Sequence, residues 1–165
     1  MHGYRRRFIA FAAILIVSIT LGRLVTQQVR RVPLHPEQLV AATGFTEFAW
    51  SPDSKTIAYI GPAGGGFDLF AVSTTGGQSR RITTSLRFKR QPRWSADGKW
   101  IAFITVQDNG NSDLRAVSPE GQTTLSLTDT PAEEDEIAWS PDSTQIAFTQ
   151  RIGTQTSIMS VDVKT

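Results

Sequence analysis

The sequence predicts an all-β protein: a partial β-propeller of about three four-stranded antiparallel blades, the third incomplete, preceded by one N-terminal hydrophobic helix. A twelve-residue phrase occurs three times, as AWSPDSKTIAYI at 49–60, RWSADGKWIAFI at 93–104 and AWSPDSTQIAFT at 138–149. Its tryptophans, Trp50, Trp94 and Trp139, are separated by 44 and then 45 residues. A period of about 40–45 residues is typical of a four-stranded propeller blade. Because a catalytic residue is normally needed only once, three copies favour an architectural role.

The first element, residues 1–26, is expected to be a signal-anchor or a signal peptide. An arginine-rich start is followed by an apolar run from Phe8 to Leu21, which has the length of a signal-peptide core. Continued past Arg23, the segment 8–25 is marginally long enough to cross a bilayer, and this is the predicted membrane contact. The best small-residue triplet, 20–22, lacks alanine, so the sequence favours an uncleaved anchor over a cleaved signal peptide. Residues 27–37 are interpreted as a linker. The body is then membrane-anchored or secreted and lies outside the cytoplasm, in the periplasm if the cell is Gram-negative.

The charged residues are distributed unevenly along the chain. There are 17 Lys and Arg against 15 Asp and Glu, a net charge of +2. No acidic residue precedes Glu37, so the positive excess belongs to the leader and the remaining body is net acidic. A nucleic-acid-binding protein needs a basic face, so the composition argues against nucleic acid as a partner. The chain has no cysteine, which excludes disulfides and thiolate metal sites.

Residues 38–165 are expected to be the repeat domain, with units at about 46–84, 91–128 and 136–165. In each unit a short first strand ends at the tryptophan, and these strands are predicted at 46–50, 91–94 and 136–139. A Ser-Pro-Asp or Ser-Ala-Asp turn follows, in which aspartate can hydrogen-bond its own backbone. The second strand carries isoleucine seven residues after each tryptophan, and the third shows apolar alternation after a glycine-rich or polar turn. An outer strand is predicted around Ile82 and Leu127.

The number of repeats is low, because propellers commonly have about four to eight blades. The third unit lacks an outer strand, which is expected near position 171, whereas 38–43 has the pattern of an orphan outer strand. Three explanations remain open: a fragment or truncated reading frame, two chains that pair to make six blades, or an open array of three blades. A homodimer would form if 38–43 of one chain supplied the strand missing after Val163 of the other. The apolar residues expected to be uncovered on the outer faces are Ile57, Tyr59, Ile146 and Phe148.

The repeated phrase resembles that of the TolB-like propeller repeats, a WD40-like class also called PD40, whose pattern is close to W-S-P-D-G-K-x-I-A-F. The resemblance covers about residues 39–165. This chain departs from the pattern at Ser54 and Ser143, where glycine is usual, and at Ala96, where proline is usual. The resemblance implies a β-propeller that is usually secreted. Its members include the periplasmic protein of the Tol–Pal system and the N-terminal domains of prolyl-oligopeptidase-like serine peptidases.

Motifs for catalysis, metals and cofactors are missing from the sequence. The only histidines are His2 and His35, and there is no G-x-S-x-G motif, so no catalytic residue is expected. The segment QDNGNSD at 107–113 offers oxygen ligands, but Pro119 stands where a calcium loop needs glutamate, which favours a hairpin turn. The glycine-rich segment 61–66 lacks the Lys-Ser/Thr of a phosphate loop and is expected to be a hairpin tip. We expect neither a metal nor a cofactor.

Two clusters of opposite charge lie one repeat apart and provide the candidate partner-binding residues. They are expected in the connectors that precede the first strands of the second and third units, on one rim of a propeller. Ion pairing between neighbouring blades is one interpretation, in which each exposed pair contributes about 0–1 kcal/mol. The other is a polarised rim that orients a protein or peptide partner. The candidates are Arg87, Lys89, Arg90, Arg93, Glu133, Glu134, Asp135 and Glu136.

Taken as a whole, the sequence predicts an extracytoplasmic binding and scaffolding module and no enzyme activity. The alternative is the N-terminal propeller portion of an exported prolyl-oligopeptidase-like serine peptidase whose catalytic domain is absent from these residues. Both hypotheses include the same repeats. They differ in whether the propeller acts as a binding module by itself or as one part of a peptidase. The three tryptophans are expected to be large buried aromatics in either case.

Overall fold

The computed structural model describes residues 39, 44, 47–85 and 87–164. The secondary structure of this part of the chain consists of eleven β-strands, which confirms the predicted all-β class. No helix in it is long and apolar enough to cross a membrane. The leader, the linker, the predicted membrane segment at 8–25 and all but one residue of the predicted strand at 38–43 lie outside the described residues.

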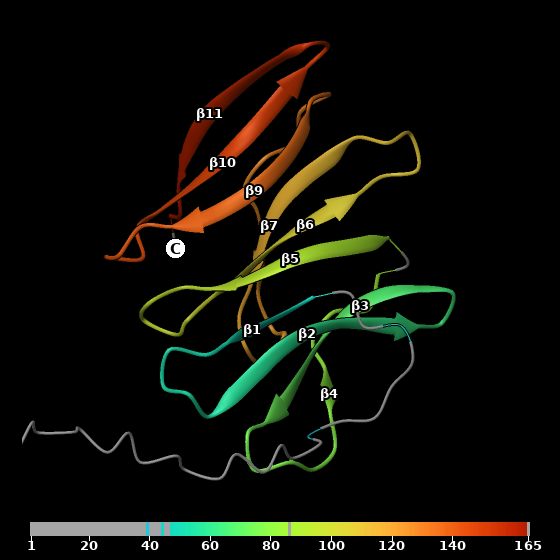
Figure 1. Cartoon of the computed structure of the whole chain (residues 1–165), viewed down its shortest axis with the longest axis vertical. Helices are drawn as coiled ribbons and strands as arrows, with labels where there is room; N and C mark the ends of the chain where they lie inside the picture. The colour runs from blue at the N-terminus through green and yellow to red at the C-terminus, as the bar shows by residue number, and fades with distance from the viewer. Residues whose placement is uncertain (1–38, 40–43, 45–46, 86, 165) are drawn as a thin grey trace, which may run out of the picture. The chain divides into compact units, whose positions relative to one another are not determined.

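Each repeat forms an antiparallel arrangement of consecutive strands, and Figure 1 shows the repeats following one another from blue-green through yellow to red. The first comprises β1 (Phe48–Trp50), β2 (Thr56–Ala63), β3 (Gly66–Ser73) and β4 (Arg80–Arg81). The second comprises β5 (Phe88–Trp94), β6 (Ile101–Val106), β7 (Ser112–Val117) and β8 (Thr124–Ser126). The third comprises β9 (Glu133–Trp139), β10 (Gln145–Ile152) and β11 (Gln155–Asp162). A single parallel bridge, Ser112 to Glu133, joins the second and third repeats.

The turn after each tryptophan has the same hydrogen bonds in all three repeats. The serine hydroxyl donates to Oδ1 of the aspartate two residues later, at 2.7, 2.7 and 2.6 Å. That Oδ1 also accepts a backbone N–H two residues further on, at 3.1, 3.1 and 3.0 Å. The serine hydroxyl and then this N–H hold the pKa of each aspartate below its usual range, and that of Asp142 is lowered to about 2. The turn is therefore a structural unit held by its own polar groups, with the serine buried in the first two repeats.

The departures from the glycine of the repeated phrase leave the turn backbone unchanged. Ser54 and Ser143 have φ of 60° and 62°, and Gly98 at the equivalent position of the second repeat has φ of 73°. A positive φ of this size lies in the left-handed region of backbone conformation. This conformation is energetically less favourable for a residue with a side chain than for glycine. The Ser143 hydroxyl accepts a hydrogen bond from the Asp97 backbone N–H at 3.0 Å, so this serine also links two repeats.

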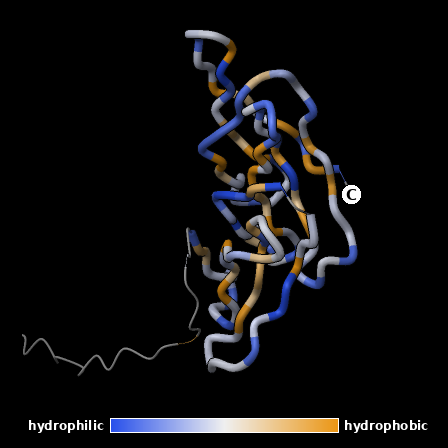
Figure 2. Tube along the Cα trace, turned by 90° about the vertical axis from the view of Figure 1, so that its right-hand side faces the viewer, coloured by the Kyte–Doolittle hydropathy of each residue, from blue (hydrophilic) through white to orange (hydrophobic). Residues whose placement is uncertain are grey.

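The core consists of two apolar layers, each lying between consecutive repeats. Alternation along β6 explains both layers, because Ile101 and Phe103 belong to the first and Ala102 and Ile104 to the second. Figure 2 shows this alternation as orange segments interleaved with white and blue along the strands. The first layer contains Ala58, Ile60, Leu69, Ala71, Ile82, Ile101, Phe103 and Val117. The second contains Ala102, Ile104, Leu114, Ile137, Ile146 and Phe148.

The expected set of uncovered apolar residues is largely wrong. Ile146 and Phe148 are buried because they face the second repeat rather than away from it. Tyr59 is 6% exposed and stacks on Phe70 with ring centroids 5.4 Å apart. Ile57 is half-buried. The large apolar side chains that are most exposed are Phe48 at 67%, Trp50 at 54%, Ile152 at 67% and Ile158 at 82%.

The tryptophans are not equally buried, which corrects the expectation that all three are core residues. Trp94 packs against the first layer and Trp139 against the second. The Trp139 indole N–H donates to the Arg93 carbonyl of the preceding repeat at 3.0 Å. Each of these rings therefore seals a junction with the repeat before it. Trp50 is more than half exposed because no described repeat precedes it.

Replacement of the tryptophans by alanine should therefore have unequal effects. We expect Trp139→Ala to lower the free energy of unfolding by about 2–3 kcal/mol, because it opens a junction and removes the bond to Arg93. Trp50→Ala should cost less than about 1 kcal/mol, since the ring is already largely in water. Urea denaturation of the purified full chain measures both. Equal losses at the two positions would contradict the junction role.

Candidate functional site

The two charge clusters lie mainly inside strands rather than in connectors, which corrects the predicted strand bounds. β5 begins at Phe88 and β9 at Glu133, three residues earlier than expected in each case. Each strand contains an irregularity where its register shifts, at Gln91 with φ 55° and at Glu136 with φ 49°. A β-bulge of this kind re-aims the side chains on either side of it. The charges break the apolar pattern of a strand, and for that reason the sequence pattern placed them in a loop.

Lys89 is not a surface residue. It is 1% exposed, and its ammonium donates to Asp68 Oδ1 at 2.6 Å and to the carbonyls of Phe67, Ser85 and Arg87 at 3.0–3.1 Å. Burial lowers the pKa of Lys89 despite the opposing effect of Asp68. Lys89 therefore fixes β5 against the first repeat and cannot contact a partner.

Asp68 is the other half of this buried ion pair and is fully buried. Thr83 Oγ1 donates to its Oδ1 at 2.8 Å, and the Arg81 guanidinium donates to its Oδ2. Burial alone would raise the pKa of Asp68, but hydrogen bonds from Lys89, Thr83 and Arg81 outweigh it, so the pKa lies below its ordinary value. The carboxylate thus stays charged in the interior because three donors surround it.

Glu134 is the second predicted site residue that proves to be internal. It is fully buried, and its carboxylate accepts hydrogen bonds from the Thr130 hydroxyl at 3.1 Å, the Leu114 N–H at 3.1 Å and the Thr128 hydroxyl. Its backbone N–H and carbonyl both bond to the Ser112 hydroxyl at 2.8 Å. These contacts join β9 to β7, so Glu134 holds the third repeat on the second.

Four of the eight candidate residues line one cavity of ≈ 210 Å³, which we call the β5–β9 pocket. The Arg90 guanidinium donates to Asp135 Oδ2 at 3.0 Å and to the Glu134 carbonyl at 3.3 Å. Arg151 forms an ion pair with Glu133, its partner across β9 and β10. The two oppositely charged clusters therefore do meet, as expected. The lining residues are Arg90, Glu133, Asp135, Glu136, Thr149, Arg151 and Thr156.

The remaining candidates lie outside the β5–β9 pocket. Arg93 and Arg87 are both exposed, and Arg93 donates to the Pro92 carbonyl at 2.9 Å. Two further residues belong to this site and were not predicted from the sequence. The Gln91 side-chain amide donates to Asp135, and Arg151 pairs with Glu133. Arg151 stands opposite Glu133 only after the bulge has shifted the register, and no sequence signal places that bulge.

The β5–β9 pocket is suited to binding a polar, positively charged group. Three carboxylates and two guanidinium groups line it, and Glu136 forms no ion pair with any described residue. An unpaired carboxylate beside partly satisfied ones attracts a cation such as an amine or guanidinium. Within 47–85 and 87–164, no group of three His, Asp or Glu side chains is placed to hold a metal ion. Residues 107–111 form the β6–β7 hairpin turn and 112–113 begin β7, and Gly64 and Gly65 form the β2–β3 tip.

Comparison with known protein families identifies the family of this chain. Residues 34–165 match the model of PD40, the TolB beta propeller domain. The chain belongs to the TolB β-propeller family. A solved structure of a putative TolB from Agrobacterium tumefaciens has the same fold, with a TM-score of 0.66 and 21% identity over 75% of this chain and 47% of that one.

Two curated relatives of this chain are named as peptidases. Dipeptidyl-peptidase 5 of Porphyromonas gingivalis is 29% identical over 74% of this chain and 20% of its own length. The uncharacterized peptidase YuxL of Bacillus subtilis is 28% identical over 74% of this chain and 20% of its own length. The chain therefore spans about a fifth of the length of these relatives.

The buried ion pair of the TolB propeller yields a stability prediction. We expect Lys89→Met to lower the free energy of unfolding by about 3 kcal/mol or more, because Asp68 loses a buried cationic partner. Lys99→Met is the matched control, since Lys99 is exposed and its pair with Asp97 at 3.3 Å lies in water. That control should change stability by less than about 1 kcal/mol. Similar small changes in both variants, measured by urea denaturation, would contradict the burial of Lys89.

Proposed function

We propose that this TolB-family chain is an extracytoplasmic binding and scaffolding module that holds a protein or peptide partner at the β5–β9 pocket. The observation that carries the proposal is the pocket itself, where charged residues of two repeats converge and Glu136 has no ionic partner among the described residues. A cavity of ≈ 210 Å³ accommodates one side chain or a chain terminus rather than a whole small molecule. The partner therefore contributes a basic group, such as a lysine, an arginine or an amino terminus.

The extracytoplasmic part of the proposal rests on the sequence of the leader. Its arginine-rich start, apolar run and far-side arginines have the order of a signal-anchor. The body that follows is net acidic and free of cysteine, which suits export without disulfide formation. The membrane contact is assigned to residues 8–25.

A second candidate function is the propeller portion of an exported serine peptidase. The names of the two curated relatives favour it, because both are peptidases that share most of this chain with a small part of their own length. In that case the pocket would guide a substrate peptide to a catalytic domain outside the residues of this chain. Both proposals use the same pocket, and the size of the native polypeptide separates them.

Fractionation of cells that make this protein tests its location and size together. An antiserum against residues 112–139 should detect a band in the membrane fraction that is much lighter than five times the 18.1 kDa of these 165 residues. Protease added to intact spheroplasts should remove that band, because the body lies outside the cytoplasm. A cytoplasmic marker protein must survive the same treatment.

Two results would count against this assignment. A band protected until the spheroplasts are lysed would contradict the extracytoplasmic location. A band about five times heavier, matching the share of the relatives that this chain spans, would replace the binding module by the peptidase portion.

Photo-crosslinking in cells tests the partner. A photoreactive residue in place of Thr156, which is exposed and lines the pocket, should give one discrete heavier adduct. Glu136→Lys in the same chain should reduce the adduct by about fivefold or more, because it reverses the charge that receives the basic group. The same probe in place of Lys99, which is exposed elsewhere, is the control and should give none.

A probe in place of Ile158, on the exposed face of β11, tests the predicted homodimer. An adduct of twice the chain mass from this position would identify a second copy as the partner that adds a strand to β11. An adduct at Thr156 that Glu136→Lys leaves unchanged, or none at all, would overturn the role of the β5–β9 pocket.

A further inference from the structure

A second cavity lies between the first and second repeats, on the other side of β5 from the β5–β9 pocket, and we call it the Arg115 pocket. Its volume is ≈ 390 Å³, within the usual range of about 300–1,000 Å³ for small-molecule sites. Its walls come from the segment between β4 and β5, from β5, β6 and β7, and from the β7–β8 turn with the start of β8. The polar residues that line it include Thr83, Thr84, Ser85, Arg87, Thr105 and Arg115.

The charge of this cavity is entirely positive. None of the described residues that line it is acidic, whereas Arg87, Lys89 and Arg115 are basic. Lys89 is already matched by Asp68 at 2.6 Å. The Arg115 side chain is half-buried and forms no hydrogen bond or ion pair within residues 47–85 and 87–164. Burial is the main cause of the lowered pKa of Lys89, and the charges of Arg81 and Arg115 add to it.

Thr105 supplies an independent observation. It is 2% exposed, it lines the cavity, and its hydroxyl has no hydrogen-bond partner in the described part of the protein. A buried hydroxyl without a partner is costly, and native proteins rarely keep one unless something satisfies it. The equivalent positions in the other repeats are Gly61 and Gln150, so the hydroxyl is not required by the repeat.

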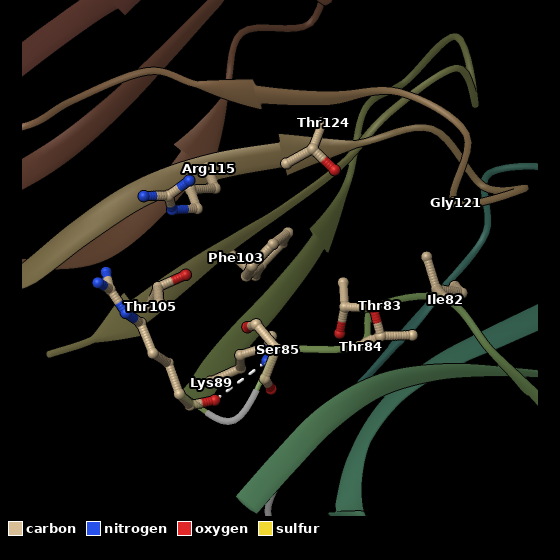
Figure 3. A pocket seen from close by; sticks show the side chains of 11 residues that line it. Ile82, Thr83, Thr84, Ser85, Lys89, Phe103, Thr105, Arg115, Gly121 and Thr124 are labelled. Carbon is tan, nitrogen blue, oxygen red and sulfur yellow. Dashed lines mark hydrogen bonds between the residues drawn. The ribbon is translucent and has the colours of Figure 1, made fainter.

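The side chains line one cavity from both repeats. Figure 3 shows Arg115 and Thr105 on neighbouring strands to one side of Phe103, and Thr83 and Thr84 of the other repeat on its opposite side. The Lys89 ammonium donates to the Ser85 and Arg87 carbonyls at 3.0 Å each and to Asp68, so it is already satisfied within the protein. Thr83 already donates its hydroxyl proton to Asp68. The donors left to face a ligand are therefore the guanidinium groups of Arg87 and Arg115 and the hydroxyls of Thr84, Ser85 and Thr105.

We infer that the Arg115 pocket binds a phosphate group, either as free phosphate or as a phosphate monoester. A guanidinium donates two parallel hydrogen bonds to a phosphate, and hydroxyls satisfy its remaining oxygens. A carboxylate has only two oxygens and leaves part of this donor set, including Thr105, without an acceptor. The cavity is larger than one phosphate group, so it has room for a small organic group attached to it.

Isothermal titration calorimetry on the full chain, purified in detergent, tests the site with defined probes. Inorganic phosphate and phenyl phosphate are titrated separately, and acetate at equal ionic strength serves as the carboxylate control. At least one phosphate should give saturable binding with one site per chain. Tighter binding of phenyl phosphate assigns the site to a monoester, and tighter binding of inorganic phosphate assigns it to the free ion.

The variants separate this site from general attraction to a positive surface. Arg115→Gln should weaken phosphate binding by about tenfold or more, because it removes a charge-assisted donor. Thr105→Val should weaken binding several-fold while leaving thermal stability equal or higher, since its hydroxyl has no partner in the protein. This second variant remains informative if Arg115→Gln fails to fold. Lys99→Gln removes the same charge elsewhere and should leave the affinity within about twofold.

Three results would overturn the inference. One is the absence of saturable binding with either phosphate. Another is acetate binding as tightly as phosphate. The third is an equal loss of affinity in Arg115→Gln and Lys99→Gln, which would mean that only the overall charge matters. Retention of full affinity by Thr105→Val would also remove the hydroxyl from the site.

Discussion

The rest of this structure depends on the contact between consecutive repeats, because no repeat can bury its own apolar faces. A small antiparallel sheet has two faces, and both faces of the second repeat are apolar through the alternation of Ile101, Ala102, Phe103 and Ile104. Burial of such surface contributes about 25 cal/mol per Å², so each layer between repeats is a main source of stability. Trp94, Trp139 and the Ser143 hydroxyl add contacts with the preceding repeat at these layers.

The two junctions use the same backbone plan with different buried charges. Thr83 and Thr128 occupy equivalent positions, and their hydroxyls accept the N–H of Leu69 and Leu114 at 3.0 and 2.8 Å. At the first junction Lys89 meets a carboxylate. At the second its equivalent is Glu134, which is surrounded by hydroxyls and N–H groups. A buried cation and a buried anion thus occupy equivalent positions. Lys89 is surrounded by hydrogen-bond acceptors, and Glu134 is surrounded by hydrogen-bond donors. The first junction can take the longer lysine side chain because three carbonyls and Asp68 receive its ammonium.

The repeat architecture was predictable from the sequence because it depends on interactions between residues that are close together in the chain. The spacing of the tryptophans and the Ser-Asp turn depend on residues close together in the chain, and each is visible three times. Whether each charged residue is buried or exposed was harder to predict, since this depends on how the strands pair. Nothing local distinguishes Lys89, which is buried, from its neighbour Arg90, which lines a pocket. The difference follows from the phase of β5 relative to its bulge, and a shift of one residue would exchange the two. The burial of Tyr59 and exposure of Trp50 likewise depend on which face meets a neighbour.

Strand β5 connects these observations, since its alternating side chains supply both cavities. Lys89 points toward the first repeat and reaches Asp68, whereas Arg90 points toward the third and reaches Asp135. The cavity on the first side is lined by basic and hydroxyl groups, and the one on the third side has an excess of carboxylates. Asp68 neutralises Lys89 within the first junction, so the free positive charge there comes from Arg87 and Arg115. Two neighbouring junctions of one fold thereby acquire opposite electrostatic character without any change in the backbone plan, and this difference is why the two proposed ligands have opposite charge.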